Sequence, residues 1–210
     1  MHRTRALWVP FLVALTLFGI AFTGCGGDDG ELLLCDGEQC DLVCDNGADP
    51  PCQAECRKGA DCDLDCNGVD CELDCASKST CTADCSESGG CTADCEGQSN
   101  CDVDCTNSGD CSLDCAGGSS CGVTCENDCT GSCTGTSACE VECNDGCALD
   151  CTGNAECSVT CTTGCAVCCS GSGSCELSCS DAEVTECPNG IKVCGIACPD
   201  SCAEVVTAGG

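Results

Sequence analysis

The chain has 210 residues, with 36 acidic and 6 basic side chains and a formal net charge of −30. This charge repels phosphate, and with only 2% aromatic residues few side chains could stack on a base, so nucleic-acid binding is excluded. The 37 cysteines are typical of an exported chain that disulfides hold together, because oxidising compartments preserve such bonds.

The first segment in chain order, residues 1–24, has the pattern of an export signal. Arg3 and Arg5 supply two positive charges, and an uncharged, mostly apolar run follows over residues 6–21. The 16 residues of this run reach about 24 Å as a helix, which is short for a membrane span. We therefore predict a signal peptide, with a retained anchor as the alternative.

The signal ends in Phe-Thr-Gly-Cys over Phe22–Cys25, which resembles the lipobox of bacterial lipoproteins. In that family a small residue precedes a cysteine that is diacylated on sulfur and becomes the new N-terminus. The resemblance implies that Cys25 carries lipid and anchors the exported chain to a bacterial membrane. Gly26 stands where an Asp would indicate retention at the inner membrane, so we expect the outer membrane or cell surface. Residues 25–34 are then the lipidated cysteine and a polar tether.

Cleavage before Cys25 removes every aromatic residue and the only His and Met of the chain. The net charge of the remainder becomes 4 − 36 = −32. Without His there is no general base that titrates near neutral pH, and no aromatic side chain is left to line a sugar cleft. We therefore expect no enzymatic activity and no catalytic residues.

The cysteine count agrees with the lipobox. An odd number of cysteines leaves one thiol unpaired in an oxidising compartment, whereas 37 minus a lipidated Cys25 leaves 36, enough for 18 disulfides. With so few large apolar side chains to bury, the chain needs such cross-links to offset its conformational entropy.

From Cys62 onward the chain repeats with a period close to ten residues. Each unit reads Cys-x-aliphatic-x-Cys, with irregular spacing between Cys125 and Cys139. The seven clear units are Cys62–Cys66, Cys71–Cys75, Cys81–Cys85, Cys91–Cys95, Cys101–Cys105, Cys111–Cys115 and Cys121–Cys125. Both cysteines and the aliphatic residue fall on one face of a β-strand, and Gly- and Ser-rich spacers indicate turns. These frequent breaks leave no segment long enough for a stable helix.

The strand prediction restricts disulfide pairing. Cysteines four residues apart on a strand lie about 13 Å apart, beyond the Cα separation of about 7 Å that a bridge tolerates. The expected partners therefore lie across the turns or on a neighbouring rung. The across-turn candidates are Cys66 with Cys71, Cys75 with Cys81, Cys85 with Cys91, and Cys95 with Cys101.

A short fixed period predicts stacked repeats, and the chain resembles the small cysteine-braced antifreeze solenoids in architecture. We predict an all-β, disulfide-rich β-solenoid of short strands over residues 35–180, followed by an irregular cysteine-containing tail over 181–210. Those antifreeze proteins present a Thr-x-Thr ladder to ice, whereas acidic residues hold most of these positions here. Either ten or twenty residues could form one coil.

One acidic residue recurs at the same place in six successive units. In the column of these residues, neighbouring carboxylates lie about 5 Å apart if each unit is one rung, or about 10 Å apart if two units make one coil. At the shorter spacing they repel one another. Bound Ca²⁺ could relieve this repulsion, and turn hydrogen bonds with loosely held counterions are the alternative. The candidate Ca²⁺ residues are Asp65, Asp74, Asp84, Asp94, Asp104 and Asp114.

Reduced cysteines offer a second metal chemistry, the binding of soft metals in a metallothionein-like manner. Those proteins resemble arrays of Cys-x-Cys and Cys-x-x-Cys, whereas this chain is built on Cys-x-x-x-Cys. Its only close cluster contains Cys165, Cys168 and Cys169, for which two disulfides with different partners are the simpler interpretation.

Together these features predict a lipid-anchored, acidic repeat protein that serves as a rigid structural or interaction module of the cell envelope. A metal-binding protein is the alternative. The expected partners are the membrane, through lipid on Cys25, and basic proteins or divalent cations, with no nucleic acid and no cofactor other than Ca²⁺.

Overall fold

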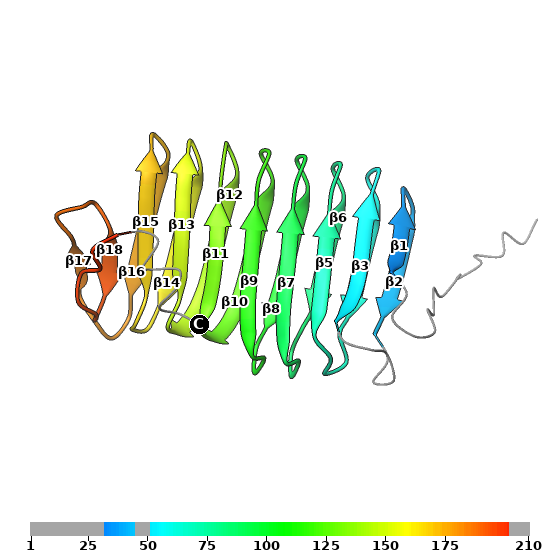
Figure 1. Cartoon of the computed structure of the whole chain (residues 1–210), viewed down its shortest axis with the longest axis horizontal. Coiled ribbons are helices and arrows are strands. Elements are labelled where there is room, and N and C mark those ends of the chain that lie inside the picture. The colour runs from blue at the N-terminus through cyan, green and yellow to red at the C-terminus, as the bar shows by residue number, and fades with distance from the viewer. Residues whose placement is uncertain (1–31, 45–50, 202–210) are drawn as a thin grey trace, which may run out of the picture.

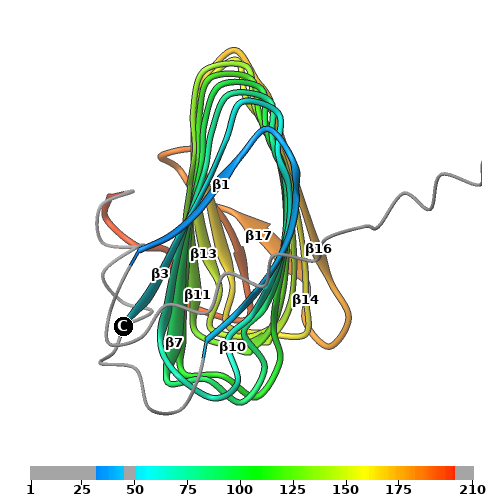
Figure 2. The same cartoon turned by 90° about the vertical axis from the view of Figure 1, so that its right-hand side faces the viewer.

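The computed structural model describes residues 32–44 and 51–201, and these residues form an all-β solenoid without a helix. Strands β1 to β16 follow one another along the chain and alternate between two sheets, in each of which these strands pair in parallel (Figure 1). Viewed along the solenoid axis, the coils superimpose as a narrow, flattened ring (Figure 2). The predicted fold class is confirmed. None of the described residues belongs to a helix long and apolar enough to cross a membrane.

Among β1 to β16, the odd-numbered strands lie in one sheet, here the odd sheet, and the even-numbered strands form the opposite one, the even sheet. The odd sheet contains β1 (Leu33–Asp36), β3 (Cys52–Arg57), β5 (Cys71–Cys75), β7 (Gly90–Cys95), β9 (Asp110–Cys115), β11 (Cys129–Cys133), β13 (Ala148–Gly153) and β15 (Ala166–Gly171). The even sheet contains β2 (Gln39–Val43), β4 (Asp61–Asp65), β6 (Thr80–Asp84), β8 (Asn100–Cys105), β10 (Ser120–Asn127), β12 (Ala138–Asp145), β14 (Glu156–Cys161) and β16 (Ser174–Cys179).

One coil takes two of the ten-residue units, which settles the choice between ten and twenty residues. Cys71 pairs in register with Cys91, 91 − 71 = 20 residues later. Towards the C-terminus the coil shortens, and Cys133 pairs with Cys151, 151 − 133 = 18 residues later. The shorter coil results from a tighter turn from the even to the odd sheet. Cys125–Cys129, Cys143–Cys147 and Cys161–Cys165 are separated by 4 positions, whereas Cys105–Cys111 is separated by 6.

The interior is one thin layer of cysteines and aliphatic side chains between the two sheets. In the odd sheet the central inward position alternates between large and small residues, so that each large side chain fills the space left by its neighbours. This column reads Leu73, Ala93, Leu113, Gly131 and Leu149. At Gly131 a Cβ would lie 2.9 Å from Leu149 Cδ1 and 3.1 Å from the Leu113 carbonyl oxygen, so a larger residue there would displace its neighbours.

Two ladders of disulfides close the turns on the two edges of the solenoid. Their Cα–Cα separations of 6.0–6.6 Å suit a bridge. The turns from the odd to the even sheet are closed by Cys35–Cys40, Cys56–Cys62, Cys75–Cys81, Cys95–Cys101, Cys115–Cys121, Cys133–Cys139, Cys151–Cys157 and Cys169–Cys175. The opposite edge is closed by Cys44–Cys52, Cys66–Cys71, Cys85–Cys91, Cys105–Cys111, Cys125–Cys129, Cys143–Cys147, Cys161–Cys165 and Cys179–Cys194.

Of the two arrangements that the strand spacing allows, the structure therefore has pairing across the turns. The four candidate pairs among Cys66 to Cys101 are each present. Every cysteine in the described ranges is disulfide-bonded, including Cys168.

Buried serines brace the turns on one edge, a feature that the sequence analysis did not single out. Ser79, Ser99 and Ser119 each donate from Oγ to the carbonyl oxygen three residues earlier, at 2.7, 2.6 and 2.8 Å. Ser119 Oγ also accepts a hydrogen bond from the Ser99 backbone N–H at 3.2 Å. The repeated placement two residues before a cysteine is the signal that could have revealed them.

A small cap covers the C-terminal end of the odd sheet. It contains β17 (Val184–Glu186) and β18 (Lys192–Cys194), which pair antiparallel, and β18 adds to the odd sheet beside β15. Ile191 and Val193 of the cap are buried with Ala148 and Ala166 in a second small core.

Covalent and polar contacts fasten this cap. The disulfides Cys179–Cys194 and Cys187–Cys198 hold it to the last coil and to itself. Lys192 Nζ donates to the Cys175 carbonyl oxygen of the even sheet at 2.7 Å. The segment 181–210, predicted to be an irregular cysteine-containing tail, therefore contains two short strands and disulfides in its described part.

Candidate functional site

Three of the recurring aspartates form a ladder on the outer face of the even sheet. Asp65, Asp84 and Asp104 are adjacent in register. Oδ1 of each accepts a hydrogen bond from the backbone N–H two residues later, at 2.9–3.0 Å. The side-chain and backbone hydrogen bonds from Ser86 lower the pKa of Asp84, because they stabilise the ionised carboxylate. Turn hydrogen bonds thus offset part of the repulsion in this even ladder.

The other three aspartates, Asp74, Asp94 and Asp114, form an odd ladder on the opposite face. Here the backbone N–H groups two residues later donate instead to cysteine carbonyl oxygens of the preceding coil, as the Glu96 N–H does to Cys75 at 2.9 Å. Burial raises the pKa of Asp94, and the charges of Asp114 and Asp74 raise it further. The odd ladder therefore retains more of the electrostatic repulsion between its carboxylates than the even ladder does.

The six aspartates therefore do not form the single column that stacked ten-residue rungs would produce. Successive ten-residue units lie on opposite sheets, so the residues separate into two ladders of three with different hydrogen bonding. The spacing between neighbours in one ladder is that of adjacent strands, about 4.8 Å.

This division bears on the predicted Ca²⁺ site. A hard cation prefers carboxylate and carbonyl oxygens, and carboxylates on adjacent strands are close enough to share one. In the even ladder one oxygen of each aspartate is already used by a turn. The odd ladder around Asp94 is consequently the better candidate, and Ca²⁺ binding there stays a prediction.

A shallow groove of about 710 Å³ crosses the outer face of the even sheet towards its C-terminal end. Gly122 lies in this groove and places no side chain between its in-register neighbours Asp102 and Glu140. Glu156 and Glu176 also line it, so the groove is acidic. This groove was not predicted from the sequence, although Gly122 is the only glycine at the second position of the seven clear units.

The sulfur atoms form stacked groups along both edges. One such group contains Cys44, Cys52 and Cys71, and another Cys85, Cys91 and Cys105, with the three sulfurs of each group within 4.8 Å of one another. Each group joins one disulfide to a sulfur of the next coil. These sulfurs become thiolate ligands for a soft metal only after reduction.

The predicted cluster of Cys165, Cys168 and Cys169 is oxidised as well. Cys165 pairs with Cys161, Cys169 pairs with Cys175, and Cys168 is in a further disulfide. The cluster thus follows the simpler interpretation of bridges to different partners.

The predicted lipidation site, Cys25, lies outside the described residues, as does the predicted signal peptide 1–24. Comparison with models of known protein families, with curated proteins and with solved structures finds no match to this chain.

Proposed function

We propose that this protein is a lipid-anchored, acidic spacer and interaction module of the bacterial cell envelope, without catalytic activity. The observation that carries this proposal is the pair of disulfide ladders that cross-link every coil of the solenoid at both edges. Each bridge closes a loop of a few residues and contributes about 2 kcal/mol in the chain-entropy model. A domain cross-linked so densely resists local opening and hence proteolysis outside the cell.

The anchor is supported by the chain's own N-terminal sequence. The segment Phe22–Cys25 resembles a lipobox, and lipidation of Cys25 leaves an even number of cysteines for disulfides. The stacked coils then project from the membrane as a narrow rod, which extends by about 4.8 Å for each coil. A rod of this kind suits the spacing or presentation of a binding surface.

The charge of the domain indicates which partners it suits. With a mature net charge of 4 − 36 = −32, the surface attracts basic proteins and cations. The groove lined by Asp102, Glu140, Glu156 and Glu176 is one place where this charge meets a concave surface. A basic segment of a partner protein is the ligand that such a groove fits.

Purification from membranes tests the proposal directly. We expect intact mass to show a diacylated Cys25, no alkylation before reduction and 36 alkylated cysteines after it. A Cys25→Ser variant should leave the membrane fraction, while a Ser120→Ala variant should stay. Protease resistance should be high in the oxidised protein and lost on reduction. Free thiols in the native protein, or easy proteolysis of its oxidised form, would contradict the spacer function.

Metal binding is the second candidate, and the sulfur groups and the odd ladder favour it. Calorimetric titration of the oxidised protein with Ca²⁺ tests the odd ladder, with Asp94→Asn as the variant that should weaken binding. Titration of the reduced protein with Zn²⁺ tests the sulfur groups. Heat in the first titration alone would assign a Ca²⁺ site, heat in the second alone would assign a thiolate site, and none in either would leave the spacer function.

A further inference from the structure

Large apolar side chains are exposed only near the two ends of the solenoid, among the residues that the structure describes. Leu32, Leu34 and Val43 of the first coil are 46–47% exposed, and Val184 and Ile196 of the cap are 43% and 44% exposed. The two ends differ in their strands. The cap pairs with the last strand of the odd sheet, whereas β1 and β2 each have a strand partner on one side only.

Basic side chains gather at the same N-terminal end. The chain beyond residue 31 has four Lys and Arg residues, and three of them, Arg57, Lys58 and Lys78, lie in the second and third coils. Lys58 and Lys78 occupy turns that stack on one edge, since the backbone of each lies against a glycine of the preceding turn. The fourth, Lys192, is held in the cap by its bond to Cys175.

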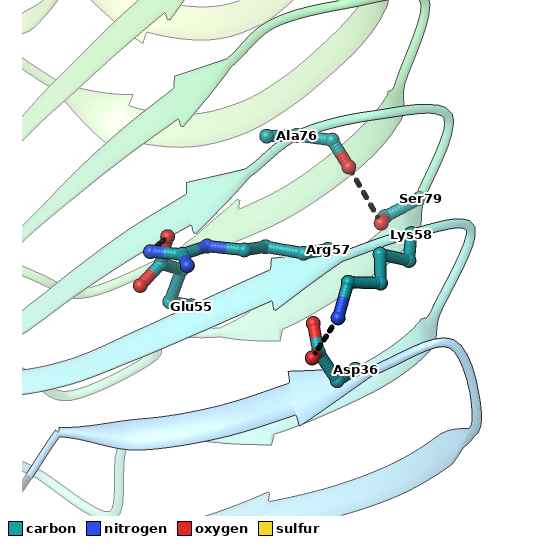
Figure 3. A network of polar contacts seen from close by, with 6 residues as sticks. All are labelled: Asp36, Glu55, Arg57, Lys58, Ala76 and Ser79. Atoms are coloured by element: carbon teal, nitrogen blue, oxygen red, sulfur yellow. Dashed lines mark hydrogen bonds and ion pairs between the residues drawn. The ribbon is translucent and has the colours of Figure 1, made fainter.

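These cations also neutralise the carboxylates beside the exposed leucines. Arg57 forms an ion pair with Glu55, and Lys58 with Asp36 (Figure 3). Glu55 is the in-register neighbour of Leu34, and it is 8% exposed. In a domain that is otherwise strongly acidic, the two carboxylates nearest to Leu34, at the odd-sheet corner of the first coils, are thus paired with cations, and Lys78 adds a positive charge in the next coil, where Asp74 begins the odd ladder beside Glu55.

The length of chain that precedes this corner indicates what covers it. Cys25 and Leu32 are 32 − 25 = 7 positions apart, and a chain of this length reaches at most about 24 Å. A lipid on Cys25 would hold the first coil at the membrane surface at a high effective concentration. A second copy of the chain is a poorer occupant, because two domains that each carry −32 repel one another.

We propose that the N-terminal corner of the solenoid docks on the headgroup region of the membrane that holds the lipid, an inference that rests on the proposed anchor at Cys25. Leu32 and Leu34 enter the interface between headgroups and acyl chains, and Arg57, Lys58 and Lys78 face lipid phosphates. The acidic remainder, including the groove, is thereby directed away from the bilayer. Docking sets the orientation of the rod, which a tether alone would leave free.

The absence of aromatic residues after Cys25 permits a clean test, because an introduced tryptophan is the only one in the lipidated protein. The Leu34→Trp variant is purified from membranes, its mass is measured, and it is reconstituted into vesicles of phosphatidylethanolamine and phosphatidylglycerol with brominated acyl chains. We expect strong quenching of tryptophan fluorescence by these lipids. Val184→Trp, at a position of similar exposure in the cap, is the matched control and should be quenched little.

Charge reversal provides the second arm. Lys58→Glu and Lys78→Glu, each added to Leu34→Trp, should lower the ratio of docked to undocked protein roughly 30-fold per lysine, because each reversal changes the charge by two units and one unit charge at an anionic surface contributes about 1 kcal/mol, or about fivefold.

The outcomes separate docking from anchoring. A lipidated Leu34→Trp protein whose tryptophan is not quenched would overturn docking and leave the anchor intact. Tryptophan fluorescence of this variant that is blue-shifted but insensitive to brominated lipid, with a doubled mass after cross-linking, would replace the membrane by a second copy. A mass without lipid on Cys25 would overturn both the anchor and the docking that rests on it.

Discussion

Removal of one charge from the odd ladder should stabilise the protein. Asp94 lies between Asp74 and Asp114 in register, on strands about 4.8 Å apart. Two unit charges at about 5 Å interact by roughly 0.8 kcal/mol in water, so two neighbours together cost about 1–2 kcal/mol. Asp94→Asn keeps the size of the side chain and removes this repulsion. We expect the gain to shrink at about 1 M salt, where charges are screened beyond about 3 Å.

The same change on the other face should have the opposite sign. Asp84 accepts hydrogen bonds from the backbone N–H and the hydroxyl of Ser86, at 3.0 and 2.5 Å, and its pKa is lowered. A lowered pKa means that folding favours the ionised form. Asp84→Asn should therefore destabilise the protein, by less than about 1 kcal/mol because the group is exposed.

The pH dependence follows from these two directions. The pKa of Asp94 is raised above its usual 3.8 in the folded protein. The ionised carboxylate therefore destabilises the folded protein fully once the pH exceeds this raised pKa, and this destabilisation is absent below pH 3.8. The benefit from Asp84 is present above 3.8 and disappears as the pH falls through its folded pKa. Stabilisation by Asp94→Asn should consequently be seen at pH 7 and vanish in acid.

Scanning calorimetry of the oxidised protein can measure both variants, and each kcal/mol should shift Tm by about 2–4 °C in a domain of this size. A carboxyl titration by NMR provides the two pKa values independently. Equal shifts of Tm for Asp94→Asn and Asp84→Asn, or a gain from Asp94→Asn that persists at pH 3, would refute the division into two ladders of different chemistry.

Three further substitutions test the packing and the cap: the first two by calorimetric Tm and the third by amide exchange. Ser119→Ala leaves buried backbone groups without a partner and should cost about 1–3 kcal/mol, whereas Ser120→Ala, on the exposed position beside it, should cost little. Leu113→Ala should cost about 3–5 kcal/mol, because its small in-register neighbours cannot fill the cavity; a cost below about 1 kcal/mol would contradict the alternating column. Lys192→Met should speed amide exchange in β18 and leave exchange in the central coils unchanged, since its bond joins the cap to the even sheet.

Much of the local structure followed from the sequence for physical reasons. The period of two in a β-strand placed both cysteines and the aliphatic residue of each unit on one face, and this face is buried, as Cys71, Leu73 and Cys75 illustrate. The reach of a disulfide then excluded pairing within a strand. The serines of the turns could have been predicted too, because they recur at one position, but their role depends on a neighbour one coil away.

The candidate sites were less predictable. The six aspartates are identical in the repeat, yet their chemistry depends on whether the N–H two residues later bonds to the carboxylate or to the preceding coil. The groove at Gly122 needs strands that are 18–20 residues apart in the chain to lie side by side. The sequence contains every residue of these sites, but it does not show which of them become neighbours in the folded protein.

The sequence by itself determined what covalent reach and strand periodicity control: short strands, turns, an inward face and disulfides across the turns. Only the tertiary structure decided that two units make one coil, because that choice depends on how the strands pair across the whole solenoid. This pairing divided one column of aspartates into two ladders on opposite faces. It also placed the exposed leucines and the few basic residues together at the end from which the proposed anchor departs.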